Sequence, residues 1–169
     1  MVKKIFLILF LTLLSDVMSY ESPTYASTNI DNTKTLILNR EQIINDLINE
    51  AHKHLGAKYI WGAKGPKSFD CSGYTSYIFN KIGYNIGRTS RHQYTEGIPV
   101  DRNQLKSGDL VFFTRRNSGK NVGHVGIVIA SNNKTGEFSF IHASVKGVKV
   151  SECVGYYERR YVGAKRIII

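Results

Sequence analysis

The chain has 169 residues, and its 23 Lys and Arg side chains against 13 Asp and Glu give a formal net charge of +10. With 42 % hydrophobic and 21 % charged residues, its composition is that of a globular protein, which excludes a wholly disordered, collagen-like or disulfide-dense chain. The length fits one compact domain with one core. Two cysteines, Cys71 and Cys153, cannot supply a four-cysteine zinc or iron–sulfur site.

The first residues, Met1–Ser19, have the features of a secretory signal peptide. Two lysines precede the apolar run Ile5–Leu14, which is shorter than the roughly 20 residues of a membrane span, and small residues follow it. We therefore expect an exported protein, periplasmic, extracellular or associated with the cell wall, without stable membrane insertion after signal cleavage. The alternative is a buried or membrane-anchoring N-terminal helix, which fits less well because polar residues follow at once.

The next segment, Tyr20–Leu38, is rich in Ser, Thr and Asn, and we expect a flexible leader there. Asn39 followed by Gln42 predicts a capping box for a helix from about Arg40 to Leu55, because apolar residues then recur at three- and four-residue spacing. One face of this helix should pack on the core.

Two further helical segments are predicted after a loop. Tyr59–Phe69 contains two glycines and a proline and is predicted to be a loop. A helix should then run from Cys71 to Ile82, with Ser68 or Asp70 as its cap. Residues Ser90–Gln93 indicate another capped helical turn.

The second half of the chain changes to short apolar strands separated by turn-rich pieces. Helices followed by antiparallel strands predict an α+β class, with N-terminal helices packed on a central antiparallel β-sheet, in one domain over residues 39–169. The predicted strands are Leu110–Phe113, His124–Ile129, Phe138–His142, Val148–Val150 and Tyr161–Ile168.

Cys71 is the candidate nucleophile. It follows a loop and stands at the predicted first turn of a helix, where unpaired amide hydrogens and the positive end of the helix dipole stabilise a thiolate. We therefore expect a thiol pKa below its usual value of about 8.5. The small residues Ser72 and Gly73 next to it would allow a substrate to approach the sulfur closely.

Two histidines are candidates for the base that a cysteine nucleophile needs. His124 opens one apolar strand, and His142 lies on the next. If the two strands pair as a hairpin through Ser131–Gly136, both imidazoles lie at neighbouring positions on one sheet face. His142 would then orient and polarise His124, the part that an Asp or Asn plays in other triads.

Three alternatives stay open from the residues alone. Each of Cys71, His124 and His142, taken singly, can be an ordinary core or surface residue. A Cys71–Cys153 disulfide would remove the nucleophile, although Cys153 has apolar neighbours and is predicted to be a buried small side chain. A zinc site built from the same cysteine and two histidines lacks a closely spaced ligand pair, so we expect neither metal nor another cofactor.

Six short motifs occur in order and are together specific. They are Tyr59-x-Trp61-Gly62, Phe69-Asp70-Cys71-Ser72-Gly73, Arg88-Thr89-Ser90-x-x-Gln93, Gly108-Asp109-Leu110-Val111-Phe112-Phe113, Gly123-His124-Val125-Gly126-Ile127 and Ile141-His142-Ala143. From Asn39 to Ile169 the chain resembles the NlpC-type family of bacterial cell-wall cysteine peptidases. That resemblance implies a circularly permuted papain-like fold.

The resemblance also implies roles for individual residues. Cys71 would be the nucleophile, His124 the general base and acid, and His142 the third polar residue. Trp61 and Gly62 would support their loop rather than contact substrate. Tyr59 would lie near the thiol and help to stabilise the oxyanion. Asp70 and Ser72 would line the substrate groove, with Asp70 binding a substrate ammonium. The residues that would shape the groove wall are Arg88, Ser90 and Gln93.

The substrate implied by the resemblance is the stem peptide of peptidoglycan, cut at the γ-D-glutamyl–diamino acid bond or at the D,D cross-link. We expect a monomer that acts on this anionic wall polymer and not on nucleic acid, since a basic exported protein meets the cell envelope first. Two other functions remain: a related papain-like thiol amidase or acyltransferase, and a catalytically inactive wall-binding module.

Overall fold

The computed structural model describes residues 25–115, 119 and 121–169, with side chains described from Thr33 onward. The predicted signal peptide lies outside these residues. The chain divides into two units, residues 1–34 and residues 35–169, and the second holds the folded domain. Among the described residues, no helix combines the length and apolar character that a membrane span requires.

Helix α1 extends further toward the N-terminus than predicted. It spans Tyr25–His52, so residues 25–38, expected in a flexible leader, are helical. The capping-box prediction is wrong: Asn39 lies inside the helix, and the Gln42 amide donates to Asp46 one turn later. No glycine or proline occurs in residues 25–38 to end a helix there. The predicted apolar face is nevertheless buried through Leu47 and Ala51.

Helix α2 spans Cys71–Lys81 and is capped by Asp70, one of the two predicted caps. The Tyr74 hydroxyl donates to the carbonyl of Ala51 at 2.8 Å, which fixes α2 against the end of α1. The short helix α3 spans Ser90–Gln93, as predicted, with Thr89 as its cap.

The segment predicted to be only a loop contains two short strands. They are β1 (Lys58–Tyr59) and β2 (Ser68–Phe69), and they pair in parallel. Two-residue strands leave no alternating pattern in a sequence, which explains why they escaped prediction. Together they hold the chain that leads into Cys71.

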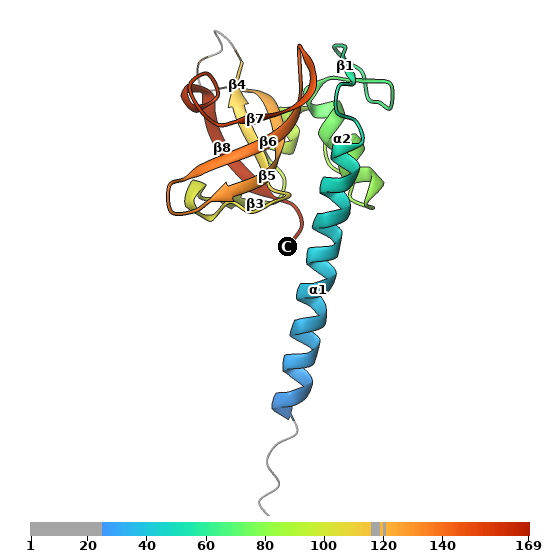
Figure 1. Cartoon of the computed structure of the whole chain (residues 1–169), viewed down its shortest axis with the longest axis vertical. Helices are drawn as coiled ribbons and strands as arrows, with labels where there is room; N and C mark the ends of the chain where they lie inside the picture. The colour runs from blue at the N-terminus through green and yellow to red at the C-terminus, as the bar shows by residue number, and fades with distance from the viewer. Residues whose placement is uncertain (1–24, 116–118, 120) are drawn as a thin grey trace, which may run out of the picture. The chain divides into compact units, whose positions relative to one another are not determined.

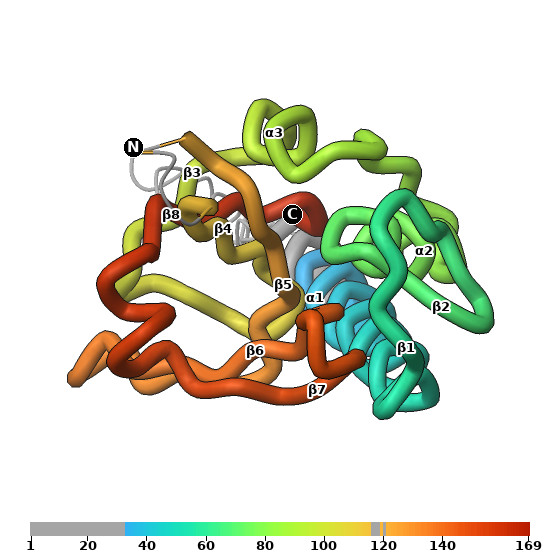
Figure 2. Tube along the Cα trace, turned by 90° about the horizontal axis from the view of Figure 1, so that it is seen from above, coloured from blue at the N-terminus to red at the C-terminus, as the bar shows by residue number. Residues whose placement is uncertain are grey.

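The main sheet has six antiparallel strands in the order β3-β8-β4-β5-β6-β7. Figures 1 and 2 show it curling, with β8 on the side away from α2. The predicted α+β class is therefore correct, and the predicted hairpin joins β5 to β6. The strands are β3 (Ile98–Val100), which was not predicted, β4 (Leu110–Thr114), β5 (Val122–Asn132), β6 (Glu137–Ser144), β7 (Gly147–Glu152) and β8 (Tyr161–Arg166).

Both faces of the central strands are buried. Along β4, Leu110 and Phe112 join the helices in one hydrophobic cluster, whereas Val111 and Phe113 join a second cluster on the inner side of the curled sheet. This accounts for the continuous apolar run of the strand, because a strand covered on one face only would alternate. The second cluster is the one beside which the two histidines lie.

Candidate active site

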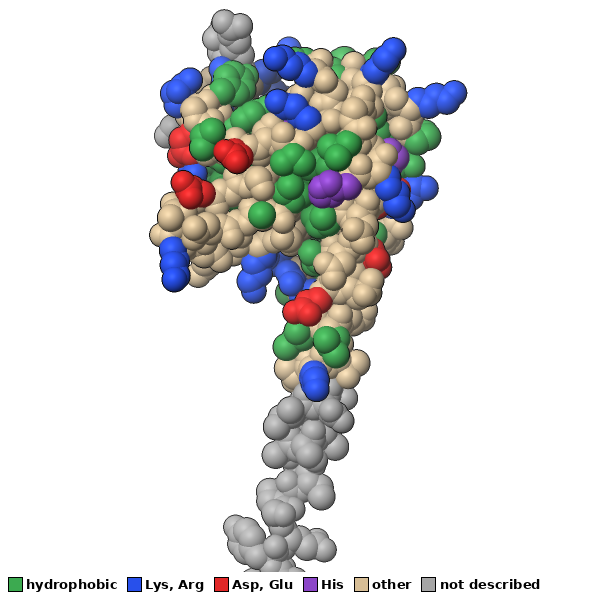
Figure 3. Space-filling view, viewed as in Figure 1, with side chains coloured by type: hydrophobic (Ala, Val, Ile, Leu, Met, Phe, Trp, Pro, Cys, Tyr) green, Lys and Arg blue, Asp and Glu red, His purple; other side chains and the backbone are tan. Residues whose placement is uncertain are grey.

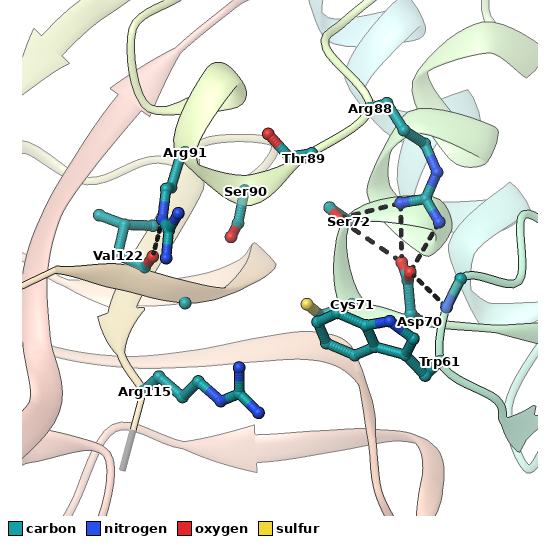
Figure 4. Close-up of a pocket in the computed structure, with 12 residues that line it drawn as sticks. Trp61, Asp70, Cys71, Ser72, Arg88, Thr89, Ser90, Arg91, Arg115 and Val122 are labelled. Carbon is teal, nitrogen blue, oxygen red and sulfur yellow. Dashed lines mark hydrogen bonds and ion pairs between the residues drawn. The ribbon is translucent and has the colours of Figure 1, made fainter. Parts of the chain in front are cut away.

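Cys71 is the first residue of α2 and lines a cavity of about 500 Å³. In Figure 4 its sulfur points into the centre of this cavity, toward the side of Ser90, with Trp61 in front of it. Residues at the start of β5, Val122 and Gly123, line the same cavity. We call it the thiol cavity.

Asp70 organises the entrance to α2. Its Oδ1 accepts a hydrogen bond from the Gly73 N–H at 2.6 Å, and its Oδ2 accepts one from the Gly62 N–H at 2.9 Å. Arg88 donates to both carboxylate oxygens, at 3.0 and 2.6 Å, as Figure 4 shows. Burial alone would raise the pKa of Asp70, but these bonds outweigh it and hold the pKa below its usual value. The carboxylate is therefore a helix cap and the partner of Arg88.

This arrangement changes the expectation for Asp70 as a binder of substrate ammonium. Each of its oxygens already accepts from Arg88 and from a backbone N–H, so an ammonium would have to compete with a two-pronged ion pair. Arg88 also donates to the Ser72 hydroxyl at 3.2 Å. The two predicted groove residues are thus tied to Asp70 at the wall of the thiol cavity.

The expected low thiol pKa is not what the structure gives. Burial of Cys71, and then the negative charge of Asp70, raise its pKa above the usual value. The N–H groups of Ser72, Val125 and Cys71 itself act in the opposite direction but do not outweigh these effects. The helix start does favour a thiolate, but the sequence could not show how deeply the sulfur is buried.

Gly73 is needed for the local fold. A Cβ at this position would lie 2.1 Å from the carbonyl oxygen of Ala63 and 2.9 Å from Oδ1 of Asp70. The loop from β1 to β2 can therefore lie directly on the first turn of α2 only if residue 73 has no side chain. This close packing brings Trp61 and Gly62 to the cavity.

The two histidines are in direct contact. Nε2 of His124 lies 2.8 Å from Nδ1 of His142, and the rings are nearly perpendicular, at 86°. His142 is fully buried. The prediction that the hairpin places the two imidazoles together is confirmed.

A β-bulge aims His124 at its partner. On β5, His124 pairs with Phe113 and Val122 pairs with Thr114, so Gly123 is an extra residue in the strand. Val122 and Val125 consequently both join the cluster beneath the helices, and His124 turns to the other face. Bulges of this kind are common beside active sites because they redirect a side chain.

Two hydroxyl groups contact His142 on the side of its ring away from His124. Nε2 of His142 lies 3.0 Å from Oγ of Ser151 and 3.3 Å from the hydroxyl of Tyr157. Because His124 uses its Nε2 toward His142, its Nδ1 is the nitrogen left to exchange a proton with a thiol. In that tautomer His124 donates from Nε2, His142 accepts at Nδ1, and Nε2–H of His142 donates to Ser151. Sequence analysis missed Ser151 and Tyr157.

Burial also sets the charge state of the histidines. It lowers the pKa of His124 to about 4 and, together with the charges of His124 and Lys149, lowers the pKa of His142 to about 2. With the thiol pKa raised and the histidine pKa values lowered, the free protein holds a neutral thiol and neutral imidazoles at pH 7.

The thiol and the histidine pair meet the same short stretch of β5. Gly123 shares the thiol cavity with Cys71, and the Val125 N–H acts on the Cys71 sulfur. These two residues flank His124. Proton transfer between Cys71 and His124 stays a prediction.

A second cavity, of about 470 Å³, lies on the His124 side of this stretch; we call it the histidine cavity. Tyr59 lines it, and the negative charge of Cys71 is among the causes that raise the pKa of Tyr59, after burial. Tyr59 therefore shares a cavity with His124 and is close enough to Cys71 to feel its charge; its role at the oxyanion stays a prediction. Lys146, Lys149 and Arg160, which sequence analysis did not single out, also line this cavity.

Two predicted groove residues, Ser90 and Gln93, and the loop residue Trp61 have distinct outcomes. Ser90 lines the thiol cavity. Gln93 does not face it: its fully buried side chain donates to the carbonyls of Ser72 and Gly87 and accepts from Thr75, so it ties α3 to α2. Trp61 was expected to support its loop, but it is 75 % exposed and lines the cavity beside Cys71.

Neither the disulfide nor the zinc site that the sequence left open is seen among the described residues. Cys71 and Cys153 are free thiols, and they lie in different hydrophobic clusters. Within residues 25–115, 119 and 121–169, no group of three or more His, Cys, Asp or Glu side chains is arranged to hold a metal ion.

On the face shown in Figure 3, Lys and Arg side chains are spread around the margins of the domain and form no single stripe.

An α+β domain with a cysteine at a helix start and a histidine pair on the sheet has the groups that thiol hydrolysis requires. Comparison with known proteins gives the family: residues 56–166 match the NlpC/P60 family profile. The chain belongs to the NlpC/P60 family.

Individual relatives agree. The chain is 43 % identical over 122 residues to "Probable endopeptidase p60" of Listeria monocytogenes, covering 72 % of this chain and 23 % of that protein. It is 38 % identical over 124 residues to "Probable peptidoglycan endopeptidase LytE" of Bacillus subtilis, covering 73 % and 34 %. A solved NlpC/P60 family protein from Bacillus cereus superposes with a TM-score of 0.67 at 32 % identity, covering 75 % and 40 %. The chain thus spans about a quarter to a third of the length of these two curated relatives.

Proposed function

We propose that this chain is an exported peptidoglycan endopeptidase that cleaves stem peptides by a Cys71–His124–His142 thiol mechanism. The observation that carries the proposal is the His124–His142 hydrogen bond, made from a strand position whose two neighbours, Gly123 and Val125, both meet Cys71, in a member of the NlpC/P60 family. The relatives named as endopeptidases support the substrate class. Their names do not identify the bond, and we infer the γ-D-glutamyl–diamino acid bond or the D,D cross-link.

Acylation begins with His124 as the general base. As the sulfur of Cys71 attacks the scissile carbonyl, the thiol proton passes to Nδ1 of His124, which becomes an imidazolium. The backbone N–H of Cys71, in the first turn of α2, supports the oxyanion, and Tyr59 lines the cavity on the His124 side. Nε2–H of His124 continues to donate to His142, which stabilises the new positive charge.

The second half of the cycle returns every group to its starting state. The carbon–nitrogen bond breaks, and the imidazolium gives its proton to the departing amine, which leaves a thioester on Cys71. Water then attacks the thioester with its proton going to His124, and the acid product leaves as the sulfur regains that proton. Neutral starting groups suit this sequence, because His124 must accept a proton first.

The test is digestion of purified muropeptides by the wild type and by Cys71→Ala, followed by mass spectrometry of the products. We expect fragments only with the wild type, and their masses will identify the bond. Because a thiol is a small group, Cys71→Ala should change the free energy of unfolding by about 1 kcal/mol or less. Identical products from the two proteins would contradict the proposal.

A further inference from the structure

The histidine cavity is a basic hollow beside the reacting groups. His124 lines it together with Lys146, Lys149 and Arg160, and no Asp or Glu is among its lining residues. Lys146 stands in the turn between β6 and β7, Lys149 lies on β7 opposite His142, and Arg160 ends a short 3-10 helix over Glu158–Arg160.

Among the described residues, no Asp or Glu forms an ion pair with any of these three cations. The ion pairs found in the described part of the chain use other basic residues, such as Arg88, Arg102 and Arg166. The Arg160 guanidinium instead stacks 4.4 Å from the ring centre of Tyr156, which holds the group in place without cancelling its charge. The cavity therefore offers positive charge to a ligand.

The thiol cavity differs in having an acidic residue in its lining. Asp70 lines it and pairs with Arg88, although Arg91 and Arg115 line it as well. The histidine cavity has basic residues and no acidic one, so a carboxylate placed there meets no negative side chain in the lining.

The mechanism assigns each half to a cavity. The acyl half becomes bonded to the sulfur of Cys71, which lines the thiol cavity. The departing amine must receive its proton from His124, which lines the histidine cavity. The half of the peptide that leaves first therefore occupies the histidine cavity.

We propose that Lys146, Lys149 and Arg160 form a carboxylate-binding subsite for the leaving half of the substrate. Its ligand is a peptide whose first residue after the scissile bond carries a free carboxylate, such as a diamino acid with an unmodified second carboxyl group. The subsite makes the protein prefer a free carboxylate to a carboxamide at that position. This inference rests on the proposed function.

The test uses two synthetic stem peptides that differ only in whether this carboxyl group is free or amidated. We expect the wild type to show a kcat/KM ratio of acid to amide of about 10 or more, since hydrogen bonds to a charged group are lost in the amide. The double variant Lys146→Gln/Arg160→Gln should lower this ratio about tenfold. Lys149 is left in place because it lies beside His142.

Lys134→Gln is a control for the loss of positive charge as such, because it removes one positive charge from an exposed turn outside the cavity. It should leave the ratio unchanged. A wild-type ratio near 1, an unchanged ratio in the double variant, or an equal loss on both peptides would overturn the subsite. The last outcome would indicate general attraction to an anionic polymer.

Failure of the proposed function can be distinguished from failure of the carboxylate-binding subsite. If the wild type cleaves neither peptide, that function fails, and the subsite is judged by calorimetric binding of the leaving-half peptide in its acid and amide forms. Tighter binding of the acid, with the preference lost in the double variant, supports the subsite. Equal binding of the two forms contradicts it.

Discussion

His124 and His142 share a hydrogen bond of 2.8 Å between Nε2 and Nδ1, with the ring planes at 86°. An edge-on arrangement lets an N–H of one ring point along the lone pair of the other. The contact consequently fixes which nitrogen of His124 can act as the base.

Ser151 should act as a positioning residue for this pair. Its hydroxyl is the nearer partner of His142 Nε2, at 3.0 Å. Replacing it by Ala allows His142 to carry its proton on Nδ1, where it can no longer accept from His124. We expect Ser151→Ala to lower kcat about 10-fold with KM nearly unchanged, by analogy with other groups that orient a reacting imidazole.

The readout specific to this role is the tautomer. The ¹⁵N chemical shifts of His142 should show Nε2–H in the wild type and a mixture in Ser151→Ala, and Ser151→Thr should restore both the tautomer and kcat. If Ser151→Ala keeps a pure Nε2–H tautomer and still loses activity, the hydroxyl acts in some other way.

Gly126 should prove intolerant of any side chain. A Cβ there would lie 2.6 Å from the ring of Phe140 and 3.1 Å from Cβ of His142. Gly126→Ala should therefore displace His142, destabilise the fold by about 1–3 kcal/mol and lower cleavage strongly. Denaturant unfolding and kcat/KM measure the two effects; a variant with wild-type activity would show that His142 can move without consequence.

Asp70→Asn should make the thiol easier to ionise. The carboxylate charge raises the pKa of Cys71, second only to burial, and its removal also leaves the Arg88 guanidinium unpaired nearby. Alkylation of Cys71 by iodoacetamide should then shift to lower pH, at a cost of about 2 kcal/mol in stability from the broken ion pair and weakened cap. Peptide mapping in a Cys153→Ala background ensures that only alkylation of Cys71 is measured. If the pH profile of alkylation does not shift in Asp70→Asn, the carboxylate does not control ionisation of the thiol.

Stability should fall as the solution becomes more acidic. The pKa of His124 is lowered to about 4 by burial, below its value near 6.5 in the unfolded chain. Between these values the unfolded state binds the additional proton, so the free energy of unfolding decreases as pH falls from about 6.5 to about 4. His142, whose pKa is also lowered, adds in the same direction.

Thermal or urea unfolding between pH 4 and 8 measures this slope. A flat profile for the wild type would mean that the buried imidazoles accept protons as readily as free ones do.

A buried ion pair distant from the chemistry should affect stability only. Arg166 at the end of β8 donates to both oxygens of Asp109 at 2.8 Å, and Asp109 is 1 % exposed. Asp109→Ala leaves the guanidinium uncompensated and should cost about 3 kcal/mol or more in unfolding free energy. The kcat of the folded fraction should stay at the wild-type value, and a selective loss of kcat would reveal a link to the site.

Sequence reasoning succeeded where the determinants are local or periodic. The cap of α2 by Asp70 depends on residues three positions apart, and the hairpin that joins His124 to His142 depends on alternation and one turn. It failed where distant segments meet. The Asp70–Arg88 pair, the burial that raises the pKa of Cys71 and the hydroxyl of Ser151 all come from tertiary packing, which no spacing in the chain encodes.

Covalent trapping tests the central claim most directly. A stem-peptide analogue ending in an electrophilic ketone should add one adduct mass to the intact protein, located at Cys71 by peptide mapping, with loss of cleavage in proportion. His124→Ala should slow trapping strongly, whereas Cys153→Ala should not. Adduct at Cys153, or trapping of Cys71 at an undiminished rate in His124→Ala, would contradict a thiol activated by the histidine pair.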